Sequence, residues 1–141
     1  MTKKILLPVD GSENSQKAVK KCLEIAKPIG AAVTALFVVD SSAYLSLPET
    51  FMWENVRGAI EEEGKEALEG VKKTFKDSGV KLKTELKEGS PAKDIVETAE
   101  EEKIDLIIMG TAGRKGLDRF FLGSVSEKVL RSAHCAVMVV K

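Results

Sequence analysis

The sequence predicts an α/β fold: a three-layer sandwich in which a five-stranded parallel sheet lies between layers built from four helices, as in Rossmann-like domains. The first observation behind this prediction is an alternation of short apolar runs, which suit strands, with longer amphipathic stretches, which suit helices. The second is size and composition. A chain of 141 residues, 43% hydrophobic and 31% charged, is typical of one globular domain, which we place at residues 1–141.

The charges of the chain balance. Lysine plus arginine and aspartate plus glutamate each number 22, so the formal net charge is zero. A neutral chain has no long-range field to attract nucleic acid or an anionic membrane surface, and neither is expected as a partner. The apolar runs are far shorter than a membrane span and no leader segment is apparent, so a cytoplasmic location is expected.

The first strand is predicted over residues 4–10, KILLPVD, because its nearly unbroken apolar character suits a central strand buried on both faces. After a short turn, Ser12 is the expected N-cap of the first helix. That helix carries a single apolar stripe and is expected to end at Pro28 and Gly30. The second strand follows over residues 31–39, AAVTALFVV.

A polar link over residues 40–50 leads into a long helical stretch from about residue 51 to residue 78. Residues 41–53 hold more apolar side chains than a solvated loop needs. We expect them to fold over the core; a surface for an unidentified protein partner is the alternative. The long helix contains three glycines, which each weaken it by about 1 kcal/mol relative to alanine and which mark either close packing or a bend: Gly58, Gly64 and Gly70.

The strand predicted over residues 80–87, VKLKTELK, alternates apolar and polar residues, which is typical of an edge strand with one solvated face. Its lysines discourage pairing with another edge. The rest of the chain continues the alternation: a third helix capped by Ser90 with Pro91 in its first turn, a buried strand over residues 104–109, a fourth helix from Ser124 to about Ser132, and a last strand over residues 135–140.

The stretch most informative about function is the loop over residues 110–124, GTAGRKGLDRFFLGS, between the fourth strand and the last helix. Ser124 and Glu127 match a capping box at the start of that helix. Glycines let backbone N–H groups approach a ligand, and a helix N-terminus adds unpaired donors and partial positive charge. With the strand order 3-2-1-4-5, this loop and Asp10 face one crevice at the switch point, where sheets of this kind bind ligands. The sequence therefore predicts a phosphate-binding site there.

Three segments together resemble the ATP-binding branch of the universal stress protein family, and the resemblance covers the whole chain. They are ILLPVDGS at residues 5–12, the pattern G-x-x-G, nine residues, G-S over residues 110–124, and AVMVV at residues 136–140. The resemblance implies the Rossmann-like fold of adenine-nucleotide α-hydrolases. It also implies a nucleotide-dependent regulatory module of the stress response that binds ATP with Mg²⁺ or Mn²⁺. A very slow ATP hydrolase that uses the same site is the alternative.

The resemblance also implies which residues touch the nucleotide. The adenosine half would lie along Pro8, Val9 and Asp10, with backbone groups of Val38 at the adenine edge. The divalent cation would be held mainly by phosphate oxygens and water, so no metal-ligating side chain is expected. The remaining expected contacts come from the glycine loop and the helix after it, where Ala112 replaces the histidine or arginine of many relatives: Met109, Gly110, Gly113, Arg114, Gly123, Ser124, Val125 and Ser126.

Little in the sequence favours catalysis. The single histidine, His134, is expected in a loop between helix and strand, and no nucleophile motif or phosphate-binding lysine motif accompanies it. The two cysteines are far apart and form no metal or redox motif; Cys22, on the apolar face of the first helix, is expected in the core. A binding protein is therefore favoured over an enzyme.

The uncharged character of the last strand predicts that the protein forms a homodimer. Residues 136–140 would form an edge without a charge or proline to discourage pairing, unlike the lysine-bearing edge at residues 80–87. Antiparallel pairing with a second copy about a two-fold axis would cover this edge, and the family resemblance implies the same arrangement.

Overall fold

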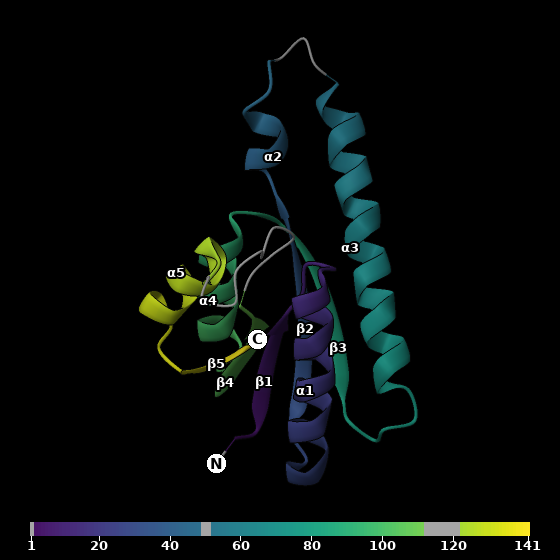
Figure 1. Cartoon of the computed structure of the whole chain (residues 1–141), viewed down its shortest axis with the longest axis vertical. Coiled ribbons are helices and arrows are strands. Elements are labelled where there is room, and N and C mark those ends of the chain that lie inside the picture. The colour runs from purple at the N-terminus through teal and green to yellow at the C-terminus, as the bar shows by residue number, and fades with distance from the viewer. Residues whose placement is uncertain (1, 49–51, 112–121) are drawn as a thin grey trace.

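Five parallel strands form one sheet in the order β3-β2-β1-β4-β5, which confirms the predicted topology. The structure is a computed structural model that describes residues 2–48, 52–111 and 122–141 (Figure 1). The strands are β1 (Lys4–Pro8), β2 (Ala32–Asp40), β3 (Leu82–Gly89), β4 (Leu106–Gly110) and β5 (Ala136–Val140).

Helices cover both faces of the sheet, as expected of a three-layer sandwich. One core cluster joins the sheet to α1 (Glu13–Ile29) and α3 (Trp53–Phe75), and the other joins it to α4 (Pro91–Glu101) and α5 (Ser124–Ser132). Alternate residues of β1 serve the two clusters: Ile5 and Leu7 face α1 and α3, whereas Leu6 faces α4 and α5. All three are fully buried, so β1 is the central strand that its apolar run predicts.

The prediction of four helices is wrong, because the described residues contain a fifth. A single turn of helix, α2 (Ser42–Leu45), lies in the link that was expected to be irregular. Asp40 starts this turn: its Oδ1 accepts hydrogen bonds from the backbone N and the hydroxyl of Ser42, at 3.0 and 2.7 Å. Four residues are too few to show a helical period, so the sequence pattern carried no sign of them.

The ends of the first helix agree with the predicted capping. Ser12 is the N-cap, and its hydroxyl oxygen accepts a hydrogen bond from Ser15 N at 3.1 Å. Gly30 is the C-cap in the left-handed conformation, with φ +67°. Pro28, however, lies inside the last turn rather than beyond it. Cys22 is fully buried on this helix, and burial raises the pKa of its thiol to about 12, so it is an unreactive core residue, as expected.

Other predicted boundaries shift by one to three residues. The long helix ends at Phe75 rather than residue 78, and β3 begins two residues later than predicted, after a turn with positive φ at Asp77 and Gly79. Ser90 occupies the N-cap of α4, but its side chain makes no capping bond. The prediction of a capping box with Ser124 as N-cap is wrong, because Gly123 is the N-cap of α5 and Ser124 is the first helical residue.

Of the three glycines of α3, Gly64 lies where the helix packs closely against the sheet. A β-carbon there would lie 2.7 Å from Cδ1 of Phe37 and 2.8 Å from Cδ1 of Leu86, so this position marks close packing of α3 on β2 and β3. At Gly58 and Gly70, in contrast, a β-carbon would meet no heavy atom within 4 Å. Only the middle glycine is therefore required by the packing.

Candidate functional site

A pocket of about 530 Å³ opens at the carboxyl ends of the central strands. This edge of the sheet is the switch point, because β1 leads to α1 on one face and β4 leads toward α5 on the other (Figure 1). The volume lies within the usual range for small-molecule sites. The sequence-predicted crevice therefore exists, at the place where the topology puts it.

Ten of the twelve predicted contact residues line this one pocket. They come from four separate parts of the chain, which only the folded sheet brings together. Gly113 and Arg114 lie outside the described residues, as does Ala112. The ten that the structure gathers are Pro8, Val9, Asp10, Val38, Met109, Gly110, Gly123, Ser124, Val125 and Ser126.

The turn after β1 is fixed by two hydrogen bonds around Asp10. Its Oδ1 accepts from the backbone N of Ser12 at 2.9 Å, and its own backbone N donates to the hydroxyl of Ser15 at 3.1 Å. Gly11 between them has φ +81°, a conformation that glycine adopts without strain. The turn thus holds the Asp10 carboxylate in the pocket wall and leads directly into the first turn of α1.

The end of β4 passes very close to α1. A β-carbon on Gly110 would lie 2.8 Å from the carbonyl carbon and 2.9 Å from the carbonyl oxygen of Asn14, so no larger residue fits without moving backbone. The Gly110 carbonyl accepts a hydrogen bond from the hydroxyl of Ser126 at 2.7 Å. Gly110 is therefore needed for packing, and the Ser126 hydroxyl proton is already used within the protein.

The start of α5 supplies backbone donors. The first N–H groups of a helix have no intrahelical partner, and here these belong to Ser124, Val125 and Ser126, all of which line the pocket. Gly123 N donates to Thr111 O, which joins the two ends of the glycine loop, and Thr111 N donates to Val140 O at 3.0 Å. Gly123 has φ −60° and ψ 154°, an extended backbone that any residue adopts. The backbone of Gly123 therefore does not require glycine, and space for a ligand is the remaining reason for a glycine here.

The pocket lining is partly polar and partly apolar. It includes hydroxyl side chains and the Asp10 carboxylate, together with apolar side chains such as Leu36, Val38 and Ile95. Among the described lining residues there are two carboxylates, Asp10 and Asp40, and no lysine, arginine or histidine. This arrangement suits a ligand with an apolar ring at one end and an anionic group, accompanied by a cation, at the other.

Sequence reasoning missed several lining residues. Asp40 and Ala43 follow the end of β2, Ile60 lies on α3, and Pro91 and Ile95 lie at the start of α4. Asp40 and Pro91 could have been found, because every segment that follows a parallel strand opens at the same edge of the sheet. Ala43 and Ile60 had no such signal, since their place depends on how α2 and the start of α3 lie over the pocket.

His134 does not belong to the pocket. It lies between α5 and β5, as predicted, and its Nε2 is 3.0 Å from Oε1 of Glu100 on the exposed surface. None of the described helices has the length and apolar character needed to cross a membrane.

Comparison with known proteins identifies the family. The family model described as "Universal stress protein family" matches residues 1–141. Universal stress protein MJ0531 of Methanocaldococcus jannaschii is 51% identical over 139 residues, which span 99% of this chain and 82% of the relative. The solved structure of universal stress protein UspA from Lactobacillus plantarum is 32% identical, with a TM-score of 0.90 over 99% of this chain and 98% of that one.

A more distant structure, at 23% identity, shares the fold with a TM-score of 0.75 over 99% of this chain and 97% of that one. It is of a universal stress protein in complex with cAMP. At this identity the likeness concerns the fold. The family model that matches the whole chain and the relative at 51% identity show the family without this structure: the chain belongs to the universal stress protein family.

Proposed function

We propose that this protein binds ATP together with Mg²⁺ or Mn²⁺ in the pocket described above, and acts as a nucleotide-dependent regulatory module. The observation that carries the proposal is the pocket itself, in which the N-terminus of α5 and a group of apolar side chains line one cavity. A nucleotide has the matching pair of features, a flat base and an anionic tail. One member of the same family, distant in sequence, is a universal stress protein solved in complex with cAMP, which agrees with this proposal.

The phosphates belong at the α5 side of the pocket. Backbone N–H groups of Ser124, Val125 and Ser126 would donate to phosphate oxygens, and the helix dipole favours the negative charge. The two carboxylates in the described lining add to the negative charge instead of balancing it. A divalent cation bound to phosphate oxygens and water supplies the compensation, which is the usual way that Mg²⁺ is held.

Calorimetric titration tests this proposal. ATP with Mg²⁺ is expected to bind with clear preference over NAD and FMN, because the first N–H groups of α5 can engage a triphosphate chain, which neither NAD nor FMN carries. The same titration with EDTA in place of the metal is expected to show much weaker binding, since the triphosphate charge is then uncompensated. Absence of ATP binding in the presence of either metal ion would overturn the proposal.

We also propose that two copies pair through β5. In the described residues this strand pairs with β4 on one side, Met138 is 36% exposed, and Leu130 on the neighbouring α5 is 41% exposed. An uncharged edge with apolar neighbours favours pairing with another such edge. Sedimentation equilibrium at micromolar concentration is expected to give the mass of a dimer, and Val139→Pro, which removes a backbone donor, is expected to shift it toward monomer. A wild type that sediments as a monomer would contradict the proposal.

A further inference from the structure

The segment between β2 and the middle of α3 projects beyond the sheet. α2 and the first turns of α3 rise past the carboxyl ends of the strands (Figure 1). We call residues 41–48 and 52–61 the arm. Its two halves are joined by a hydrogen bond from the indole nitrogen of Trp53 to the carbonyl of Leu47, at 3.1 Å. The arm supplies Ala43 and Ile60 to the wall of the nucleotide pocket.

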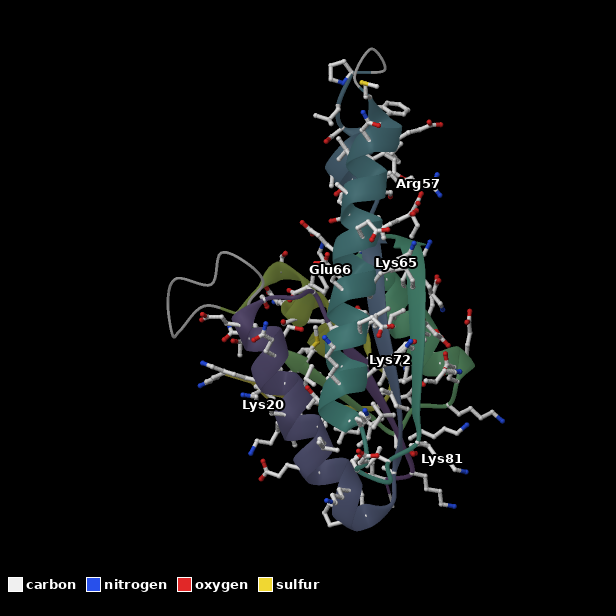
Figure 2. All side chains as sticks on the ribbon, turned by 90° about the vertical axis from the view of Figure 1, so that its right-hand side faces the viewer. Lys20, Arg57, Lys65, Glu66, Lys72 and Lys81 are labelled. Atoms are coloured by element: carbon white, nitrogen blue, oxygen red, sulfur yellow. The ribbon has the colours of Figure 1, made fainter. Side chains whose placement is uncertain are left out.

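One carboxylate at the end of β3 holds both halves of the arm. Oε1 of Glu88 accepts a hydrogen bond from the hydroxyl of Tyr44 on α2, and Oε2 lies 2.6 Å from Nε of Arg57 on α3. Figure 2 shows Arg57 on the upper part of α3, above the end of β3. Tyr44 is only 6% exposed, so its hydroxyl has few alternative partners.

The protonation states suit this arrangement. The hydrogen bond to Glu88 raises the pKa of Tyr44, and the charge of Glu88 raises the pKa of Arg57. Both groups are therefore donors over the whole physiological pH range. Arg57 has a second partner in Glu61, whose Oε1 lies 3.2 Å away on the same helix. That second contact stays within α3 and ties nothing to the sheet.

The two residues held by Glu88 lie next to, or one helical turn from, the arm residues that line the pocket, Ala43 and Ile60. Tyr44 follows Ala43 in α2, and Arg57 lies one turn before Ile60 in α3. Two further hydrogen bonds link the arm to the end of β3: Ser41 N and Ser41 Oγ both donate to the Gly89 carbonyl, at 3.0 and 3.4 Å, and they fix only the base of the arm. Glu88 is therefore the described side chain that ties both halves of the arm to the end of β3.

The arm faces one end of the ligand only. Along the sheet, β4 and the start of α5 lie on one side of β1, and β2, β3 and the arm lie on the other. A nucleotide whose phosphates bind at α5 extends across β1 toward β2, so its nucleoside end reaches Val38, Ala43 and Ile60.

We propose that Glu88 is a positioning residue for the nucleotide: by holding Tyr44 and Arg57, it sets the arm against the nucleoside end of the ligand without touching the ligand itself. The inference rests on the proposed nucleotide binding. It predicts that loss of the Glu88 contacts weakens binding of a whole nucleotide but not of a phosphate chain alone.

The test compares wild type with Glu88→Gln and with Glu61→Gln as the matched control, which removes the other carboxylate partner of Arg57. Each protein is titrated with ATP and with tripolyphosphate, both with Mg²⁺. If the arm of Glu88→Gln is docked in about one molecule in ten, its apparent affinity for ATP falls about tenfold. The tripolyphosphate titration is expected to be the same in all three proteins, and Glu61→Gln is expected to bind ATP as wild type does.

A second measurement follows the arm itself. Trp53 is the single tryptophan of the chain and lies in the arm, so acrylamide quenching of its fluorescence reports on arm position in the free protein. Quenching is expected to increase in Glu88→Gln and not in Glu61→Gln. Tyr44→Phe, which removes one hydroxyl, is expected to shift both readouts in the same direction by a smaller amount, and serves if Glu88→Gln does not fold.

The outcomes separate the two proposals. A wild type that binds no nucleotide overturns the proposed function, and this inference with it. A wild type that binds ATP, with Glu88→Gln and Tyr44→Phe binding equally well, overturns the role of Glu88 alone. Equal loss of ATP and tripolyphosphate binding in Glu88→Gln also overturns it, because the effect would then not be confined to the nucleoside end.

Discussion

Gly64→Val is expected to destabilise the protein by about 1–3 kcal/mol, the usual cost of overpacking a core. The first added carbon would lie 2.7 Å from the ring of Phe37, which is 4% exposed and has no room to move. The other contact, with Leu86, costs less, since that side chain is 37% exposed and can turn outward. Urea unfolding followed by circular dichroism measures the change as a lower midpoint with an unchanged slope.

Gly70→Val provides the matched control on the same helix. A β-carbon at Gly70 meets no heavy atom within 4 Å, so the substitution changes only helix propensity. We expect its free energy of unfolding to lie within about 0.5 kcal/mol of the wild-type value. Equal effects at Gly64 and Gly70 would mean that α3 does not pack on the sheet as closely as described.

Gly123→Val is expected to weaken ATP binding by about ten- to a hundredfold while the protein remains folded. Gly123 is buried in the pocket wall directly before α5, where the phosphates are proposed to bind. Its φ of −60° and ψ of 154° are accepted by valine, so the backbone itself is not strained. The expected loss corresponds to about 1–3 kcal/mol of steric conflict with the ligand.

The measurement is a calorimetric titration, with far-UV circular dichroism to establish that the variant is folded. Gly123→Ala is expected to show a smaller loss in the same direction. Gly70→Val, at a position that does not line this pocket, is expected to bind ATP normally. If Gly123→Val keeps the wild-type affinity, the phosphates do not lie at the start of α5.

The places of two strands could be predicted from their own patterns: the run at Ile5 to Leu7 has no polar face and suits a central strand, whereas residues 80–87 alternate and suit an edge. The last strand is apolar throughout although it lies at the other edge, so its place follows from the overall strand order and not from its own pattern. The start of β3 was less certain, since Val80 and Leu82 have the same place in the alternation. The turn at Asp77 and Gly79 decides between them, and it depends on backbone angles that the pattern does not encode.

Some residues of the candidate site could also be predicted from the sequence, and others could not. Asp10 and the residues around Gly123 could be predicted because they follow parallel strands or begin a helix, and topology alone brings such positions to one edge. Gly123 and Ser124 are both good N-cap residues, so the sequence could not place the start of α5 to within one residue. Ala43 and Ile60 reach the pocket through long-range folding of the arm, for which a single sequence holds no local signal.

The central place of β1 has a consequence for synthesis of the protein. Its Ile5 pairs with Val33 on one side and with Leu106 on the other, and Lys3 N and Lys4 N both donate to Oδ2 of Asp105 at 2.9 Å. While the first hundred residues emerge from the ribosome, β1 can pair with β2 but has no partner for its other edge. Such an edge is prone to wrong pairing, and closure must wait for a distant segment. Of the five strands, β1 is thus the first to be made and among the last to be completed, and the pocket takes shape only after β4 and the start of α5 have been made.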